Sequence, residues 1–145
     1  MSHTSTILAE QINHIIAQGL PQAQDSGFCV THAEAQQVRC VLTYHADQMR
    51  PGNTLSGPTM MMLADAAMYA LVLANDPNQI MSVTHDFHIH FLARPAPQDL
   101  IAIATLLRAG RRSMVMRVDL YSNDTLVAHA TGSYARVAPR MSSNP

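Results

Sequence analysis

The spacing of apolar residues separates helical from extended segments along the chain. Four apolar residues near the N-terminus recur at the spacing of one helical face: Leu8, Ile12, Ile15 and Ile16. Gln and Asn occupy the opposite side, and Gly19 followed by Pro21 ends the pattern. We therefore predict an amphipathic N-terminal helix over residues 5–19.

Six later segments have the pattern of β-strands, and the first two of them are expected to form a hairpin. Apolar and polar residues alternate in most of these segments, which is typical of strands with one buried face. The fourth is instead an apolar run broken only by Thr105, so we expect it to be covered on both sides. The segments are residues 28–32, 38–45, 83–93, 100–107, 113–120 and 126–137.

A loop over residues 47–58 leads into the most informative segment, a predicted helix over residues 58–74. Pro58 suits the first turn of a helix, and good helix formers follow it. Asp65 is the only charged residue in the segment, so the helix is apolar on every side and is predicted to be buried all round. Its apolar stretch is too short, and too interrupted by the acid, to predict a membrane span.

These elements together predict an α+β fold. One buried helix with five or six mostly sequential strands indicates an antiparallel sheet wrapped around a long central helix, with the N-terminal helix added. The length of 145 residues suits one domain over residues 1–145. Its tail, over about residues 139–145, is predicted to be disordered.

Composition narrows the classes of function. Hydrophobic residues make up 48% of the chain and the net charge is -1, so no basic surface is expected for nucleic acid or an anionic membrane. Cys29 and Cys40 form no CxxC pair, and the first residues lack the pattern of a secretory signal, so we expect a cytoplasmic protein. The motifs GxSxG, HExxH, GxGxxG and the P-loop are absent from the sequence.

Asp65 is the first candidate for chemistry. An ionised carboxylate in an apolar helix has to be paired, hydrogen-bonded, neutralised or exposed to a wet cleft. A general base is one interpretation, and a structural bond to the surrounding sheet is the other. Gly57, just before the helix, has an N–H that could hold a developing oxyanion with the help of the helix dipole. The alternative for Gly57 is a plain loop glycine.

The segment NTLSGPTMMMLAD, residues 53–65, resembles the signature of PaaI-like thioesterases of the hotdog fold. In that family a His-Gly-Gly opens the central helix and a Leu-Ala-Asp carries the catalytic acid. FLARPA at residues 91–96, followed by Asp99-Leu100, is similar to a turn of the same family. RAGR at residues 108–111 and AHATG at residues 128–132 resemble its last hairpins. The resemblance covers roughly residues 43–137.

This resemblance implies hydrolysis of a small, medium-chain or aromatic acyl-coenzyme A, with no cofactor beyond the coenzyme A of the substrate. It implies that Asp65 is the general base or nucleophile, that the Gly57 N–H polarises the thioester carbonyl, and that Thr84 orients the attacking water. Two residues depart from the family pattern, since Ser56 replaces the His and Pro58 replaces the second Gly. Pro58 has no N–H to donate. An altered substrate, or a chain that binds acyl-CoA without hydrolysing it, remains open.

If Gly57 and Asp65 both act, one chain is not enough. Eight positions separate them, or roughly 12 Å along a helix, so a single carbonyl group cannot touch both. A second subunit must then bring its Asp65 near the first subunit's Gly57. This matches the assembly that the resemblance implies, a homodimer or a dimer of dimers.

Other residues are weighed as substrate contacts. Four residues of the central helix are candidates for the acyl channel or for plain core packing: Met61, Met62, Met68 and Tyr69. Four arginines are candidates for the phosphates of coenzyme A or for solvated turns: Arg94, Arg108, Arg111 and Arg112. Asn53, Ser56 and Pro58 are further candidates because they belong to the motif.

Histidines support two rival interpretations. Asp86, His88 and His90 share one strand face and could ligate a metal, although no further ligand is evident and we predict none. A hotdog hydratase or dehydratase would need a histidine beside the acid, and His45, His85 or His88 could serve.

Overall fold

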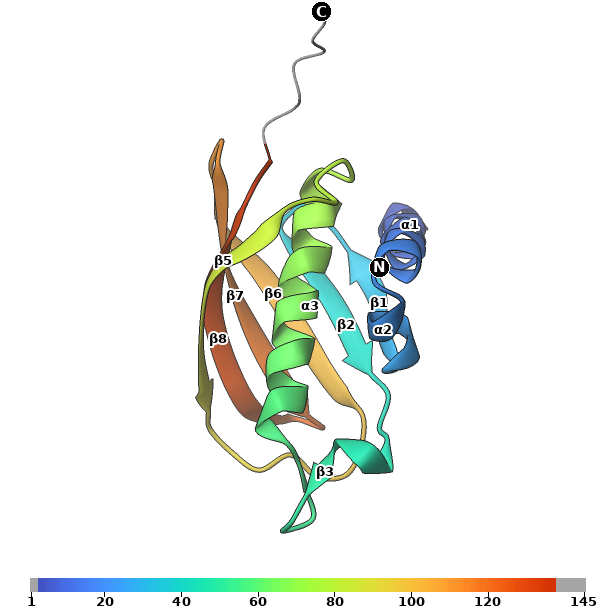
Figure 1. Ribbon diagram of the computed structural model, residues 1–145, viewed down its shortest axis with the longest axis vertical. Helices are drawn as coiled ribbons and strands as arrows, with labels where there is room; N and C mark the ends of the chain where they lie inside the picture. Colours follow the sequence, from blue (N-terminus) through green and yellow to red (C-terminus); the bar gives the residue numbers. More distant parts are fainter. Residues whose placement is uncertain (1–2, 138–145) are drawn as a thin grey trace, which may run out of the picture.

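A six-stranded antiparallel sheet curves around one long helix, α3 (Gly57–Asn75), in the computed structural model, which describes residues 3–137 (Figure 1). The predicted tail, residues 139–145, lies outside the described residues. The other helices are α1 (His3–Gly19), α2 (Pro21–Asp25) and the 3-10 helix η1 (Ala46–Gln48). The strands of the sheet are β1 (Phe28–Ala33), β2 (Gln37–Leu42), β5 (Val83–Phe91), β6 (Leu100–Ala109), β7 (Ser113–Ser122) and β8 (Thr125–Ala135).

The strand order in the sheet is β1-β2-β6-β7-β8-β5, so β1 and β5 form the edges. β5 pairs with β8 and not with β6, the strand that follows it in the chain. After β2 the chain passes through α3, lays β5 on the far edge, and returns to β6 in the middle of the sheet (Figure 1). This topology confirms the predicted fold class, and α1 packs against β1 on the same side of the sheet as α3.

Two stretches have more structure than their sequence pattern indicates. The chain re-enters a helix at Pro21, so α2 follows α1 directly, because proline is well tolerated in the first helical turn. The predicted loop before α3 contains η1 and the small hairpin of β3 (Met49–Arg50) and β4 (Thr54–Leu55). Positive φ angles at Gly52 (101°) and Asn53 (57°) form the turn of that hairpin.

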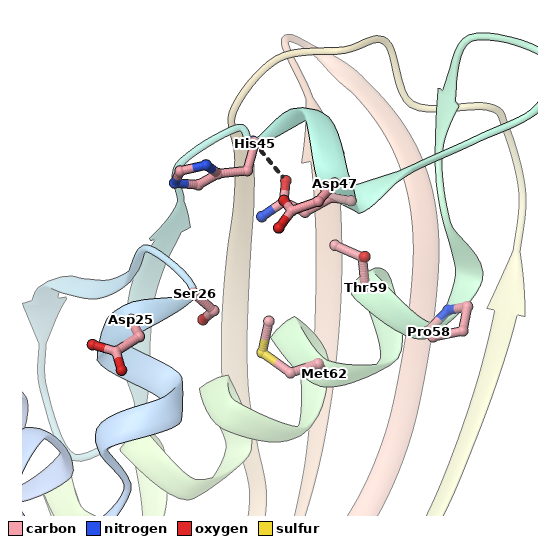
Figure 2. Close-up of a pocket in the computed structure, with 8 residues that line it drawn as sticks. Asp25, Ser26, His45, Asp47, Pro58, Thr59 and Met62 are labelled. Atoms are coloured by element: carbon pink, nitrogen blue, oxygen red, sulfur yellow. Dashed lines mark hydrogen bonds between the residues drawn. The ribbon is translucent and has the colours of Figure 1, made fainter.

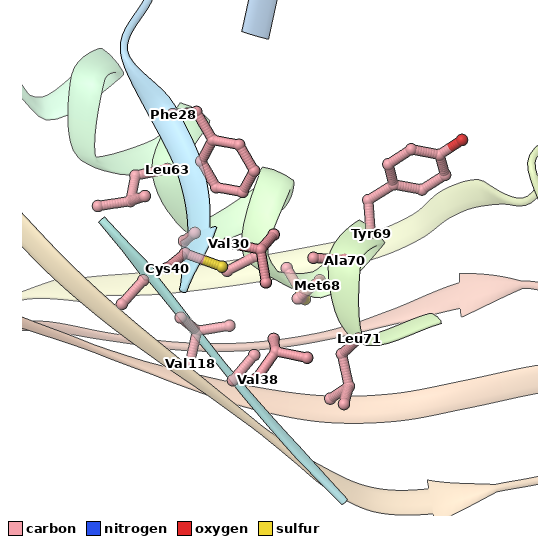
Figure 3. Close-up of a cluster of buried hydrophobic side chains, with 14 of the residues drawn as sticks. Phe28, Val30, Val38, Cys40, Leu63, Met68, Tyr69, Ala70, Leu71 and Val118 are labelled. Carbon is pink, nitrogen blue, oxygen red and sulfur yellow. The ribbon is translucent and has the colours of Figure 1, made fainter. Parts of the chain in front are cut away.

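The core lies between α3 and the concave face of the sheet. Figure 3 shows Leu63 and Leu71 of α3 close to Val30, Val38 and Val118 from three different strands. All five side chains are buried. Full burial of one such side chain contributes about 1.5–3 kcal/mol, so this layer holds the helix in the sheet. By length and hydropathy α3 also has the composition of a membrane span, but most of its apolar side chains are buried against the sheet as part of the core.

Three predictions about burial are wrong. A bulge between Val30 and His32 turns Ala33 inward in place of His32, so the alternation of β1 is broken. β6 is buried on one face, and its other face is only half-buried, because none of the described elements covers the sheet there. The helix α3 is not buried all round, since Met61 is 42% exposed and Asp65 is half-buried.

Candidate active site

The start of α3 is fixed by its own side chains. Ser56 is the N-cap residue, and its hydroxyl oxygen accepts a hydrogen bond from the Thr59 N–H at 3.2 Å and contacts the Thr59 hydroxyl at 2.8 Å. Pro58 occupies the first turn, where its missing N–H costs nothing. The Ser-Gly-Pro variant of the motif therefore builds a regular helix start and leaves Gly57 with its N–H.

Asp65 lies about two turns further along this helix, on the side that faces β5 and β8. Its Oδ1 accepts a hydrogen bond from the Thr84 hydroxyl of β5 at 2.8 Å. The same Oδ1 accepts a second one from the Tyr134 hydroxyl of β8, also at 2.8 Å. Tyr134 further contacts the Asp65 main-chain oxygen at 3.1 Å. The carboxylate is thus bonded to the sheet, as the structural interpretation expected, and it also faces a cavity.

Tyr134 is a site residue that sequence analysis missed. It is 4% exposed, and burial, reinforced by the Asp65 charge, raises the pKa of its hydroxyl above the ordinary range for tyrosine. The hydroxyl is therefore neutral at physiological pH and can act as a donor. The signal was present in the pattern, because alternation in the last strand puts this one polar aromatic group on the inner face with Ala128, Ala130 and Gly132.

The cavity beside Asp65 has a volume of about 800 Å³ and a mainly apolar lining. Asp65, Thr84 and Tyr134 line one part of it. The remaining wall comes from the junction of α1 and α2, from α3, and from the segment before β5: Ile16, Gly19, Leu20, Gln22, Ala23, Ser26, Met62, Ala66, Tyr69, Ile80, Met81, Ser82 and Val83. A carboxylate at the side of an open apolar cavity is suited to act on a polar group attached to an apolar tail.

Of the residues predicted for an acyl channel, Met62 and Tyr69 line this cavity. The Tyr69 hydroxyl donates to the Ile80 carbonyl oxygen at 2.8 Å and so ties α3 to the segment before β5. Met68 is fully buried against Gly132 and belongs to the core, which is the core-packing alternative given for it. Met61 points outward from α3 and does not line the cavity.

A smaller cavity of about 370 Å³ adjoins the first and shares Ser26 and Met62 with it. Figure 2 shows Asp25 and Asp47 on its two sides, with His45 nearby. Two carboxylates make this neighbouring space unfavourable for phosphate groups.

Gly57 lines a different cavity, of about 620 Å³, together with Pro58, Phe91 and Arg94. Within residues 3–137 the Gly57 N–H has no hydrogen-bond acceptor. The Phe91 ring lies over this glycine, since a Cβ added at Gly57 would be 3.5 Å from it. Asn53 is in the turn between β3 and β4 and does not line this space. Gly57 and Asp65, although on one helix, therefore belong to two separate cavities of the subunit.

The four predicted phosphate-binding arginines do not form one cluster. Arg94 lines the Gly57 cavity, and there its companion is Arg50, which sequence analysis did not select. Arg108, Arg111 and Arg112 line another cavity at the β6–β7 turn. That turn is at the opposite end of the sheet, near the C-terminal end of α3 (Figure 1). The strands separate Arg94 from the other three arginines, because β6 and β7, each ten residues long, lie between the Arg94 loop and the β6–β7 turn.

Among the described residues no histidine side chain is hydrogen-bonded to Asp65. His88 and His90 contact each other through their Nε2 atoms at 3.1 Å, and His90 pairs with His129 on the next strand. The described part of the chain holds no group of three or more His, Cys, Asp or Glu residues in a metal-binding arrangement. Over the same residues the side chains that bond the Asp65 carboxylate are two hydroxyls, Thr84 and Tyr134.

Comparison with known proteins is consistent with this geometry. The family described as the thioesterase superfamily matches residues 52–129. A candidate thioesterase from Silicibacter sp. TM1040 is 29% identical, with a TM-score of 0.80 over 90% of this chain and 92% of that chain. The PaaI protein of the E. coli phenylacetic acid degradation operon is 19% identical, with a TM-score of 0.79 over 92% of this chain and 96% of that chain.

A mutant PaaI protein from Thermus thermophilus is 23% identical, with a TM-score of 0.73, and the match covers 81% of this chain and 99% of that chain. These likenesses confirm the hotdog fold expected from the motif. No curated protein matches the chain.

Proposed function

The chain belongs to the thioesterase superfamily, and from that membership we propose that it hydrolyses acyl-coenzyme A thioesters with Asp65 as the group that activates the attack. The observation that supports this most directly is the position of Asp65. Its carboxylate is oriented by Thr84 and Tyr134 at the side of an apolar cavity of about 800 Å³. An apolar acyl group in that cavity places its thioester carbon beside the carboxylate.

In the proposed reaction Asp65 accepts a proton from a water molecule while the water oxygen bonds to the thioester carbon. The carbonyl electrons move to oxygen. The N–H of a Gly57, at the start of the α3 helix of a second subunit, stabilises that charge. Collapse of the intermediate breaks the carbon–sulfur bond, and the proton held by Asp65 goes to the leaving thiolate. The products are a carboxylic acid and free coenzyme A. Direct attack by Asp65, followed by hydrolysis of the anhydride, gives the same products and is the alternative path.

This reaction needs a second copy of the chain. Gly57 and Asp65 line separate cavities, so the Gly57 that serves one Asp65 has to come from a partner. The β5 edge has the apolar residues for such a contact, since Val83 is 59% exposed and Phe91 48%. An unpaired edge strand also offers its backbone N–H and C=O groups to a partner strand. We therefore propose a homodimer, or a dimer of such dimers, with two shared sites.

Arg50 and Arg94 favour coenzyme A as the thiol part of the substrate. Both line the cavity that contains Gly57, and in the proposed complex this cavity receives the thiol part of the substrate. Arginine binds phosphate oxygens through paired charge-assisted hydrogen bonds. Arg108, Arg111 and Arg112 line a separate cavity at the β6–β7 turn, so we do not assign them to the same phosphates. The cytoplasmic location remains a prediction.

The first experiment measures release of coenzyme A from a panel of acyl-CoAs by the wild type and by Asp65→Asn. The amide oxygen of asparagine can still accept from Thr84 and Tyr134, so the fold is expected to persist while the base is lost. Turnover should fall by roughly a hundredfold or more. Asp119→Asn is the matched control, since Asp119 bonds His129 on the outer face of the sheet. Full activity of Asp65→Asn would refute the mechanism.

Binding without hydrolysis is the second candidate, and Pro58 is the observation that favours it, because it removes one N–H from the start of α3. It predicts that the wild type binds acyl-CoA, measured by calorimetry, and releases no thiol.

A shared site makes a further prediction. Gly57→Pro removes the N–H, and Asp65→Asn removes the base, so each variant alone should be inactive. When the two variants are co-expressed, about half of the dimers contain one copy of each. One of the two sites in such a mixed dimer has both its Gly57 and its Asp65 intact, so about one quarter of wild-type activity should return. No recovery in purified mixed dimers would contradict a site that is built from two chains.

A further inference from the structure

Resting on the proposed function, we propose that Tyr134 is a positioning residue, which with Thr84 immobilises Oδ1 of Asp65 and leaves Oδ2 as the oxygen that acts in the reaction. Two hydroxyls meet this one atom, each at 2.8 Å. Over residues 3–137 no hydrogen bond is made to Oδ2. The two oxygens of the carboxylate are therefore not equivalent.

The convergence of the two hydroxyls follows from strand pairing. Thr84 and Tyr134 are partners in the register of β5 and β8, so their side chains emerge side by side on the inner face of the sheet. Asp65 approaches both from α3. Two donors from adjacent strands oppose rotation of the carboxylate, because rotation that exchanges Oδ1 and Oδ2 breaks both bonds. Oδ2 then stays on the cavity side, with its lone pairs available for a proton.

Tyr134 is itself held in place. Its ring stacks on Tyr69 with centroids 6.1 Å apart and planes inclined by 24°. Tyr69 in turn is fixed by its bond to the Ile80 carbonyl oxygen. Because burial keeps the Tyr134 hydroxyl protonated, it remains a donor over the pH range in which the enzyme is assayed. A buried tyrosine with both its ring and its hydroxyl fixed is suited to orient another group.

A purely structural role for Tyr134 makes a different prediction. Its contact with the Asp65 main-chain oxygen also joins α3 to β8, so loss of the hydroxyl could weaken folding alone. In that case the free energy of unfolding would fall while kcat of the folded protein stayed the same. Positioning instead predicts a lower kcat at unchanged KM, because the substrate still binds in the apolar cavity while the base is misaligned.

The test is steady-state kinetics of Tyr134→Phe in the full-length protein, with urea unfolding of the same sample. We expect kcat to fall roughly ten- to a hundredfold, the effect of a small misplacement of a reacting group, with KM little changed. Tyr121→Phe is the matched control, since Tyr121 is on the outer side of β7 and loses the same hydroxyl away from the site. Wild-type kcat in folded Tyr134→Phe would overturn the proposal.

Thr84 provides an independent comparison. Thr84→Ser keeps a hydroxyl and Thr84→Val removes it at nearly constant shape, so we expect the serine variant to have the higher kcat. Equal kcat in the two would also overturn the proposal. If Asp65→Asn is inactive and Tyr134→Phe fully active, the hydrolase stands and only this inference fails. A wild type that releases no thiol from any acyl-CoA would refute the proposed function and this inference with it.

Discussion

Replacing Gly19 with leucine is expected to shorten the acyl groups that the protein accepts. Gly19 ends α1 and lines the cavity beside Asp65. A Cβ built at this position meets no heavy atom within 4 Å, so it projects into open space. Leucine is also the better helix former of the two, by about half a kcal/mol or more. The substitution therefore fills part of the cavity without straining the fold.

The size of the effect follows from the cavity volume that the leucine side chain occupies. The four side-chain carbons of leucine displace about four methylene groups of a long acyl chain. At about 0.8 kcal/mol for each buried methylene, the loss is about 3 kcal/mol. This corresponds to a decrease of roughly two hundredfold in kcat/KM for acyl groups long enough to reach Gly19. We expect acetyl and propionyl groups to be too short to reach Gly19, so kcat/KM for acetyl- and propionyl-CoA should change little.

The assay follows thiol release from saturated acyl-CoAs of increasing length, for the wild type and Gly19→Leu at equal concentrations of folded protein. Gln18→Leu is the control, since Gln18 is exposed on the same helix and does not line the cavity. The reasoning is refuted if Gly19→Leu lowers kcat/KM equally for all chain lengths, or if long acyl groups are hydrolysed as before.

Three further predictions concern stability and reactivity. Gly132→Ala should lower the free energy of unfolding by about 1–3 kcal/mol, because the new Cβ would lie 3.0 Å from Sδ of Met68 and 2.7 Å from a backbone oxygen. An unchanged midpoint of urea unfolding would contradict this. Ser56→Ala should cost about 1 kcal/mol through loss of the N-cap, and equal stability would show that the cap is dispensable. Burial raises the pKa of the Cys40 thiol, whereas Cys29 is exposed. A thiol reagent should therefore modify Cys29 alone in the native protein and both cysteines in urea. Equal rates of modification of the two cysteines in the native protein would contradict this.

Local pattern was enough to predict α1, α3 and the six strands of the main sheet, and to single out two candidate site residues. Alternating residues identify the strands, and the apolar run with Pro58 at its start identifies α3. Asp65 was conspicuous because it is the single charge in that helix, and Gly57 because it precedes the helix. In each case the decisive information lies within a few residues, where chain geometry itself relates position to direction.

Tertiary structure alone decided which elements meet. Tyr134 bonds Asp65 from 69 residues away, because the sheet topology places β8 against α3. The same topology separates Arg94 from the arginines of the β6–β7 turn. It also puts Met62 in the cavity while Met68, six residues later, is in the core. Periodicity tells which face of an element is apolar, but the partner of that face depends on packing of the whole chain, which no local pattern encodes.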